Sequence, residues 1–374
     1  MSRRVPGTSG WRTPRAALEP ERVEMPTRWS RNVRHPLIIA GNAIFTVLIL
    51  LALVGGGVFV FARQSLEAPG PLAADKVVNI PPHKGIREIG DILRQEGVID
   101  RPWTFVAIAL LAKSRDDLKF GEYQFTRQAS LRDVIDTLTD GKVVQHQITI
   151  PEGLTSEQIV QRLMDMDVLS GNIRDIPKEG SLLPQSYHYP RGTPREQVIQ
   201  RMRQMRDRVV QEVWQHRTPD VPLRSPDELV TLASIVEKET GRGEERGRVA
   251  AVFVNRLKQH MKLQSDPTII YGLVGGKGTL GRPIQKREIE QATSYNTYVI
   301  QGLPQGPICN PGRDALEAVA NPARTKELYF VANGSGGHTF SETLEQHQKA
   351  VEHLRAVEQR ESAAAAARPP APSH

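Results

Sequence analysis

The stretch LVTLASIVEKETGRGEERGRVAAVFVNRLKQHMKLQSDPTIIYGL, residues 229–273, places two glutamates at the end of an otherwise apolar helical segment. The preceding residues 225–228, SPDE, have the order of a helix N-cap, a first-turn proline and a capping-box glutamate. Apolar residues then recur at helical spacing as far as Val236. Gly241 and Gly243 are expected to end this helix, because glycine is common just after helix C-termini.

The two glutamates differ in the direction they face on this predicted helix. At about 100° per residue from Val236, Glu239 lies at the edge of the buried stripe, whereas Glu237 faces away. Partial burial and the negative end of the helix dipole both favour a protonated carboxyl. Glu239 is therefore the better candidate for a general acid, which must carry a proton near neutral pH. The alternative is a solvated glutamate paired with Arg242 or Arg246.

An uncharged run of 26 residues at 37–62 predicts a helix that spans a membrane. At 1.5 Å per residue it exceeds the roughly 30 Å of a bilayer's hydrocarbon core. A cleaved signal peptide would have a shorter apolar region nearer the N-terminus, so we expect a retained span. Segment 1–36 carries eight arginines and three glutamates, which favours a cytoplasmic N-terminus. The remaining chain is then expected outside the cytoplasm.

The charge distribution, the single cysteine and the missing metal and phosphate motifs argue against several classes of function. The formal net charge is +7, of which segment 1–36 supplies +5, so the rest of the chain is nearly balanced. We therefore expect no nucleic-acid partner, which would need a basic face on the folded domain. Cys309 is alone and is interpreted as an inert loop residue. Zinc, calcium and Walker phosphate-loop motifs are missing, so no metal or cofactor is predicted.

The chain outside the predicted span divides into four segments. Residues 63–76 are rich in proline, glycine and alanine and read as a linker. From 77 to 150, periodic patterns predict a small α+β module. From 151 to 360 we expect a mixed α/β domain that forms a cleft, and the low-complexity tail 361–374 is expected to be disordered. The predicted strands are 77–80, 123–125 and 143–150, and residues 328–340 are predicted as a hairpin. The predicted helices are 86–96, 102–112, 131–140, 195–216 and 344–360, and a further helix is predicted after Thr155, which caps it with Gln158 at N3. Residues 182–193 are predicted as a loop.

The motifs of the larger domain resemble those of the YceG-like family, the membrane-anchored endolytic murein transglycosylases known as MltG. The resemblance rests on segments that occur in the family's order and spacing. They are ASIVEKET (233–240), VAAVFVNRL (249–257), LQSDPTIIYGL (263–273), SYNTY (294–298), GLPQGPICNPG (302–312) and LYFVANGSGGHTFSETLEQH (328–347). A looser match extends upstream to about residue 77, where the family has a LysM-like module associated with glycan chains.

This resemblance implies an enzyme that cuts peptidoglycan glycan strands internally. The family's second glutamate in the EKE pattern is the acid/base, which corresponds to Glu239, with Glu237 as the fallback. A lytic transglycosylase can work with one dominant carboxyl, since the C6 hydroxyl of N-acetylmuramic acid (MurNAc) is the nucleophile. The product is a 1,6-anhydro end, formed when the β-1,4 bond from MurNAc to N-acetylglucosamine (GlcNAc) breaks. In the family this cleavage terminates the elongation of nascent strands.

Further residues are predicted to contact substrate in a cleft. Glu245 matches an acidic position of the family and can either support the cleft or cap the helix that begins at 246, and the sequence favours capping. Asp266 can cap a helix, and His338 can face either the cleft or a hairpin. The aromatic and amide side chains suited to sugars are Tyr187, Tyr295, Asn296 and Tyr298.

The partners and location follow from the same argument. We expect peptidoglycan strands, a single membrane span and peptidoglycan synthases as partners. The expected location is the cell inner membrane, with a periplasmic catalytic domain. Two alternatives are a non-catalytic glycan-binding or scaffold protein and a pyridoxal-phosphate lyase, and the predicted topology counts against the lyase.

Overall fold

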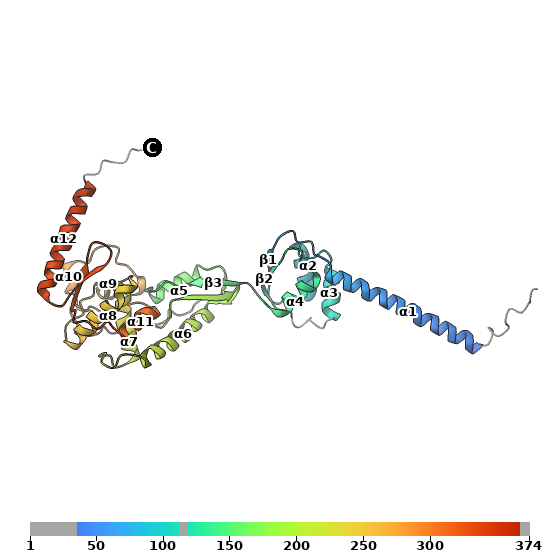
Figure 1. Ribbon diagram of the computed structural model, residues 1–374, viewed down its shortest axis with the longest axis horizontal. Coiled ribbons are helices and arrows are strands. Elements are labelled where there is room, and N and C mark those ends of the chain that lie inside the picture. Colours follow the sequence, from blue (N-terminus) through green and yellow to red (C-terminus); the bar gives the residue numbers. More distant parts are fainter. Residues whose placement is uncertain (1–35, 112–117, 367–374) are drawn as a thin grey trace, which may run out of the picture. The chain divides into compact units, whose positions relative to one another are not determined.

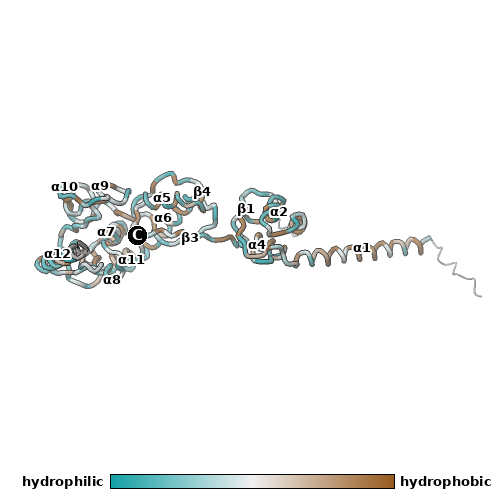
Figure 2. Tube along the Cα trace, turned by 90° about the horizontal axis from the view of Figure 1, so that it is seen from above, coloured by the Kyte–Doolittle hydropathy of each residue, from teal (hydrophilic) through white to brown (hydrophobic). Residues whose placement is uncertain are grey.

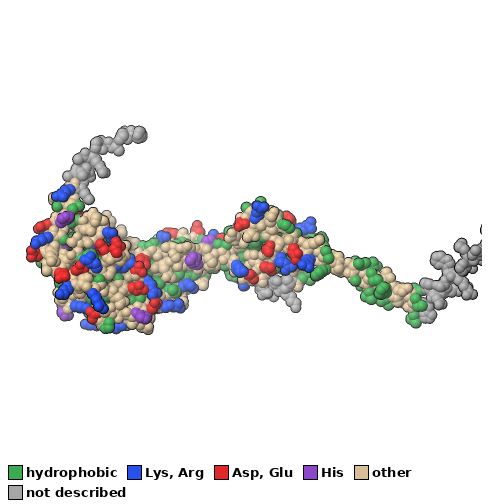
Figure 3. Space-filling model, viewed as in Figure 1, with side chains coloured by type: hydrophobic (Ala, Val, Ile, Leu, Met, Phe, Trp, Pro, Cys, Tyr) green, Lys and Arg blue, Asp and Glu red, His purple; other side chains and the backbone are tan. Residues whose placement is uncertain are grey.

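The computed structural model describes residues 36–111 and 118–366, and it begins with one long apolar helix (Figure 1). This helix, α1 (Pro36–Glu67), has no buried residue and is apolar along most of its length (Figures 2 and 3). It is long and apolar enough to cross a membrane, as predicted for 37–62. Its last residues lie in the segment predicted as a linker. The basic segment before Pro36 lies outside the described residues.

The next elements form a small α+β module, as predicted. Strands β1 (Lys76–Ile80) and β2 (Gly121–Phe125) pair antiparallel, with Lys76 opposite Phe125. Three helices complete it: α2 (Ile86–Gln95), α3 (Pro102–Leu111) and α4 (Leu131–Asp140). Leu93, Phe105, Tyr123 and Leu138 are among the fully buried side chains of this module.

The strand predicted at 143–150 joins a different sheet. It is β3 (Gln145–Thr149), and it pairs antiparallel with β5 (Ser186–Pro190). The predicted loop 182–193 thus contains a strand, in which Tyr187 and Tyr189 are buried and alternate with exposed neighbours. The flanking proline and glycine obscured this two-residue period in the sequence. A second sheet consists of the short parallel strands β4 (Leu169–Ser170) and β6 (Thr193–Pro194).

Helices α5 (Ser156–Met164) and α6 (Arg195–Gln215) cover these strands. Thr155 caps α5 with Gln158 in a reciprocal capping box, as the sequence predicts. The β3–β5 sheet and the two helices share one apolar cluster that contains Ile148, Ile159 and Val198.

The C-terminal part is built around α7 (Pro226–Glu239), which packs against α6, α8 (Gly243–Lys258) and α11 (Arg313–Ala320) (Figure 1). All eight residues from Leu229 to Val236 are buried, so α7 has protein on every side rather than a single apolar stripe. The remaining elements are α9 (Asp266–Val274), the 3-10 turn η3 (Gly275–Lys277), α10 (Lys286–Ile289), the antiparallel hairpin of β7 (Tyr329–Ala332) and β8 (His338–Ser341), and α12 (Leu344–Ala366).

The ends of α7 follow from local sequence. Ser225 accepts a hydrogen bond from the Glu228 N–H at 3.2 Å, which confirms the predicted N-cap. The predicted capping box is incomplete, because the Glu228 carboxylate accepts the Arg224 N–H at 2.6 Å instead of the Ser225 N–H. At the other end Glu239 is the last helical residue, and Thr240 is already extended. The prediction that Gly243 helps to end this helix was wrong, because Gly243 is the first residue of α8. Glu239 therefore stands at a sharp turn between two helices of the core.

The predicted hairpin at 328–340 is confirmed by β7 and β8. The final helix was predicted over 344–360, and it continues to Ala366, so the first part of the predicted disordered tail is helical. Residues 367–374 of that tail lie outside the described residues.

Candidate active site

Glu239 lies where α7 meets the segment that precedes α9. Its Oε1 accepts a hydrogen bond from the Ser265 hydroxyl at 2.5 Å. The side chain keeps some solvent exposure, although protein atoms surround most of it. Burial, together with the nearby charge of Asp266, raises the pKa of Glu239 to about 7, while Ser265, His338 and Arg256 act in the opposite direction. A carboxyl with this pKa can both donate and accept a proton near neutral pH.

Ser265 is positioned by its backbone. Its N–H donates to the Thr297 hydroxyl at 2.9 Å, and the residue is almost fully buried. The preceding residue, Gln264, has a φ of 54°, a left-handed conformation that costs free energy for a residue with a side chain. Such a conformation is held only when its surroundings fix it, so the direction of the Ser265 hydroxyl toward Glu239 is built into the fold.

Asp266 and Tyr298 form a second pair beside this carboxyl. The Tyr298 hydroxyl donates to Asp266 Oδ1 at 2.7 Å. Asp266 was predicted to cap α9, but the N-cap residue is Ser265, and Asp266 is the first residue of the helix. Burial and the Asp266 carboxylate raise the pKa of Tyr298. Both predicted residues therefore lie close enough to Glu239 to interact with it electrostatically, and they are hydrogen-bonded to each other.

Glu245 and His338 form the third pair of the site. Glu245 Oε2 lies 2.7 Å from His338 Nδ1, and its Oε1 accepts the His338 backbone N–H at 3.0 Å. Although burial opposes the change, these hydrogen bonds from His338 lower the pKa of Glu245. Glu245 therefore does not cap α8, which was the preferred interpretation of the sequence, but fastens the β7–β8 hairpin to α8. A Cβ on Gly337 would lie 2.6 Å from Glu245 Oε1, so a larger residue there would have to displace this carboxylate.

Arg256 is a buried cation close to the same carboxyl. Its guanidinium donates to the backbone oxygens of Leu328 at 2.7 Å and Leu263 at 2.8 Å. These bonds tie α8 to the start of β7 and to the segment that carries Ser265. Arg256 is thus a scaffold residue whose charge also reaches Glu239.

Glu237, the fallback acid, lies in a different environment. Its Oε2 accepts the Gly312 N–H at 2.8 Å, and burial followed by the charge of Glu152 raises its pKa. The expectation that it faces away from the protein was wrong, because α7 is enclosed on all sides. Two carboxyls of raised pKa therefore stand two residues apart, and only Glu239 has the hydroxyl of Ser265 as a partner.

Three predicted sugar contacts have other partners in the structure. The Asn296 side chain is buried and donates to the carbonyls of Gln291 at 2.8 Å and Ile289 at 2.9 Å, so it organises its own loop. Tyr187 is buried, and its hydroxyl donates to the Leu183 carbonyl. Tyr295 packs edge-on against the ring of Tyr271 with 4.8 Å between centroids. These contacts favour structural roles for Asn296 and Tyr187, whereas Tyr295 stays partly exposed.

Cys309 is buried, as an inert role requires. Its thiol donates to the Ser234 carbonyl at 3.3 Å. Burial raises the pKa of this thiol well above its usual range, so the reactive thiolate is suppressed.

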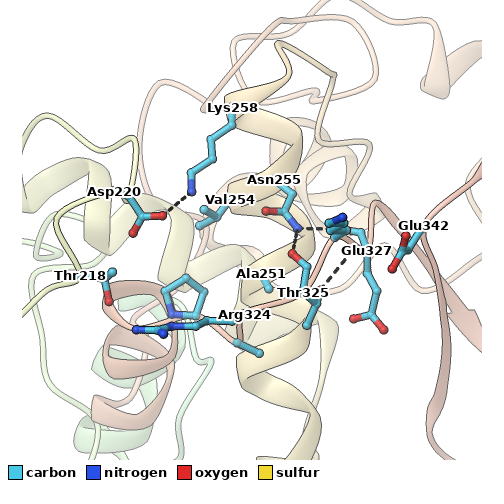
Figure 4. A pocket seen from close by; sticks show the side chains of 13 residues that line it. Thr218, Asp220, Ala251, Val254, Asn255, Lys258, Arg324, Thr325, Glu327 and Glu342 are labelled. Atoms are coloured by element: carbon cyan, nitrogen blue, oxygen red, sulfur yellow. Dashed lines mark hydrogen bonds and ion pairs between the residues drawn. The ribbon is translucent and has the colours of Figure 1, made fainter.

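A surface pocket of about 760 Å³ is lined by residues of α8 and of the segment before β7 (Figure 4). Some of its polar groups are paired with one another: Lys258 with Asp220 at 2.8 Å, and the Asn255 amide with the Thr325 carbonyl at 2.9 Å. Glu239 does not line this pocket, so it is a separate feature from the three pairs described above.

Ser265 and Arg256 are the site residues that sequence reasoning missed. Ser265 lies 26 positions from Glu239, and its hydroxyl is aimed by the left-handed Gln264. The only sequence signal was the SDP turn at 265–267, which reads equally well as an ordinary helix start.

The sequence was compared with known proteins, solved structures and protein-family models. It is 29% identical over 336 residues to the endolytic murein transglycosylase of Bacillus subtilis strain 168, covering 80% of this chain and 91% of that protein. It is 28% identical over 364 residues to the endolytic murein transglycosylase of Streptococcus pneumoniae D39, covering 83% of this chain and 65% of that protein. A crystal structure of a YceG-like protein from Listeria monocytogenes is 29% identical, with a TM-score of 0.46, and the match covers 74% of this chain and 98% of that one. The model of the YceG-like family matches residues 78–353, and this chain belongs to that family.

Proposed function

We propose that this chain is an endolytic peptidoglycan transglycosylase whose acid/base residue is Glu239. The observation that carries the proposal is a carboxyl with a pKa of about 7 that lies at the end of α7, a helix with eight consecutive buried residues, and that accepts a hydrogen bond from Ser265. A general acid needs a pKa near the working pH, so that it is protonated before the reaction and ionised after it. The names of the Bacillus and Streptococcus relatives supply the substrate class.

The reaction needs one proton donor that becomes a proton acceptor. Glu239 donates its proton to the oxygen that leaves with GlcNAc as the bond from C1 of MurNAc breaks. The C6 hydroxyl of the same MurNAc then attacks C1, and the Glu239 carboxylate takes its proton. The products are a GlcNAc end with a free hydroxyl and a 1,6-anhydro-MurNAc end, and Glu239 returns to its protonated form.

The neighbours of Glu239 adjust this proton transfer. The Ser265 hydrogen bond stabilises the carboxylate that forms in the first step, whereas the charge of Asp266 destabilises it. Burial raises the pKa of Glu239 most, the charge of Asp266 adds to that rise, and the Ser265 hydrogen bond offsets part of it, which leaves the pKa at about 7. Tyr298, on Asp266, and Tyr295 offer ring faces for a sugar.

The remaining parts of the chain fit an enzyme that works on strands as they emerge from a membrane. We assign α1 as a single inner-membrane span, segment 1–36 to the cytoplasm and the domains after it to the periplasm. The 77–150 region would serve as a LysM-like glycan-binding module, and peptidoglycan synthases would be the partners. Cleavage of nascent strands at this place would end their elongation.

The test is digestion of purified, uncrosslinked glycan strands by the full chain in mild detergent, read by mass spectrometry. We expect internal products that end in 1,6-anhydro-MurNAc, and we expect Glu239→Gln to abolish them. Glu345→Gln, on the exposed face of α12, is the matched control and should cleave normally. Glu237→Gln tests the fallback residue directly.

Each other outcome rejects part of the proposal. Reducing-end products would identify a hydrolase with a second catalytic carboxyl. Binding of strands without cleavage by the wild type would favour a scaffold protein. Loss of cleavage in Glu237→Gln alone would move the acid to that residue.

A further inference from the structure

Helix α3 carries an apolar face that no described residue of the protein covers. Its sequence, PWTFVAIALL, is apolar around almost the whole circumference. Phe105 and Ala109 are fully buried on one side, where α3 packs against α2. At about 100° per residue, Trp103, Leu110 and Leu111 fall together on the opposite side. They are 63%, 49% and 83% exposed, and Ala107, also exposed, lies between them.

Helix α3 packs tightly against α2, so its exposed face is not the result of loose packing. A Cβ on Gly90 of α2 would lie 3.3 Å from Phe105 and 3.4 Å from Pro102, near the limit of real contacts. Helix α3 is therefore fixed against the module, and its outer face has one orientation. Large exposed apolar faces on a fixed element mark contact with a partner or a membrane.

The chain itself places this module near the membrane. Helix α1 ends at Glu67, and its uncharged run ends at residue 62, so about 7.5 Å of helix follows the run. The Gly70 N–H already donates to the Gln128 carbonyl at 3.1 Å, and Gln128 donates to the Leu72 carbonyl at 3.0 Å. Only three residue steps separate α1 from this bonded network, a reach of about 10 Å. The module thus starts within about 20 Å of the hydrocarbon edge.

We infer that the Trp103–Leu110–Leu111 face of α3 inserts into the interfacial region of the same membrane that holds α1. Tryptophan is enriched at that depth, and helices that lie in the interface bury a leucine-rich side by about 5–10 Å. A stable contact with a second protein buries about 800 Å² on each partner, more than this ten-residue helix presents on one side. The inference rests on the membrane span assigned under the proposed function, and it adds a second contact.

The test measures lipid contact at position 110 in the full chain reconstituted into liposomes. Leu110→Cys carries a bimane fluorophore, and Asp136→Cys on the exposed side of α4 is the matched control. Cys309 is buried and should take no label, which the wild type verifies. We expect lipids brominated on their acyl chains to quench bimane at 110 several-fold more than at 136, and aqueous iodide to show the reverse order. Adding Leu111→Glu to the Leu110→Cys chain should reduce the lipid quenching.

Two results would overturn the inference. Equal iodide quenching at both positions would place the face in water. Protection from both quenchers that disappears when the protein is diluted in the bilayer would assign the face to a second copy of the chain. Thermal unfolding of each labelled chain checks that the fold is intact.

Separate readouts distinguish this inference from the proposed function. Flotation with liposomes reports the α1 span, and a chain that does not float rejects both the span and the inference. Digestion of soluble strands in detergent reports the enzyme, and Leu111→Glu should leave that rate unchanged. An inactive chain with a lipid-quenched position 110 would reject the enzyme and retain the membrane contact.

Discussion

Helices α7 and α3 are both apolar through their central turns, yet the protein surrounds only one of them. In α7 eight consecutive residues are buried, because α6, α8, α9 and α11 all contact it. In α3 only Phe105 and Ala109 are buried among ten residues. A helix with apolar residues on every face is expected to be buried on every face. The comparison teaches that an apolar helix sequence predicts that the helix is shielded from water. It does not say whether protein or lipid shields it.

The largest effect is expected at the end of α7. Glu239→Gln should lower the cleavage rate by about 10²–10⁴-fold, because it removes the proton donor while keeping the size of the side chain. Product formation measured at pH 6 gives the ratio to wild type. A variant that retains half of the wild-type rate would show that the enclosed end of α7 has no catalytic role.

Replacing one leucine by alanine should destabilise the protein much more in α7 than in α3. Leu232→Ala, in the enclosed part of α7, should lower the free energy of unfolding by about 2–5 kcal/mol, since it leaves a cavity. Leu110→Ala, on the outer face of α3, should change it by less than about 0.5 kcal/mol in detergent. Guanidinium unfolding of the full chain measures both. Equal losses would mean that the outer face of α3 is covered by protein.

The buried end of α7 also predicts a pH-dependent stability. Unfolded Glu239 ionises near 4.5 and the folded residue near 7, so the folded state holds the proton more tightly. The stability that this proton confers is complete below about pH 4.5 and is lost as the pH rises through 7. Glu239→Gln escapes the loss, so its advantage over wild type should grow by at most about 3 kcal/mol between pH 4.5 and 8. Unfolding at several pH values tests this, and a constant difference would contradict the raised pKa.

The smallest predicted effect concerns the hydroxyl that contacts Glu239. Ser265→Ala removes a hydrogen bond to the carboxylate, so the pKa of Glu239 should rise further. The alkaline limb of the rate–pH profile should then move to higher pH by about one unit. Ser181→Ala, whose hydroxyl bonds only to the Lys178 carbonyl, is the control and should not move the limb. A shift toward lower pH would show that Ser265 does not act on the carboxylate.

Local sequence patterns predicted the helix limits and caps well, but they predicted poorly which strands pair with each other. The limits of the helix 131–140 and the caps of α5 and α7 were correct, because they depend on neighbouring residues. Strand β5 was missed, and β3 was placed in the upstream module, since strand pairing joins residues about 40 positions apart.

The same division applies to the site. The choice of Glu239 over Glu237 came from a helical wheel that assumed one buried stripe and from the resemblance of the EKE pattern to the family motif. Neither predicted that the Ser265 hydroxyl donates to Glu239, and the choice itself stays a prediction. The roles of Glu245 and Asp266 were not readable, because their partners His338 and Tyr298 lie 93 and 32 positions away. Nothing in a one-dimensional pattern encodes those distances.

The buried position of Cys309 has a consequence for how the chain matures. Once its thiol is enclosed beside the Ser234 carbonyl, no oxidant of the surrounding medium can reach it. In the topology that we propose, an unfolded chain that has just crossed the membrane exposes the same thiol. Its exposure to oxidative damage is therefore limited to the time before the α7 core closes, and the folding rate of that core sets the fraction of molecules that escape it.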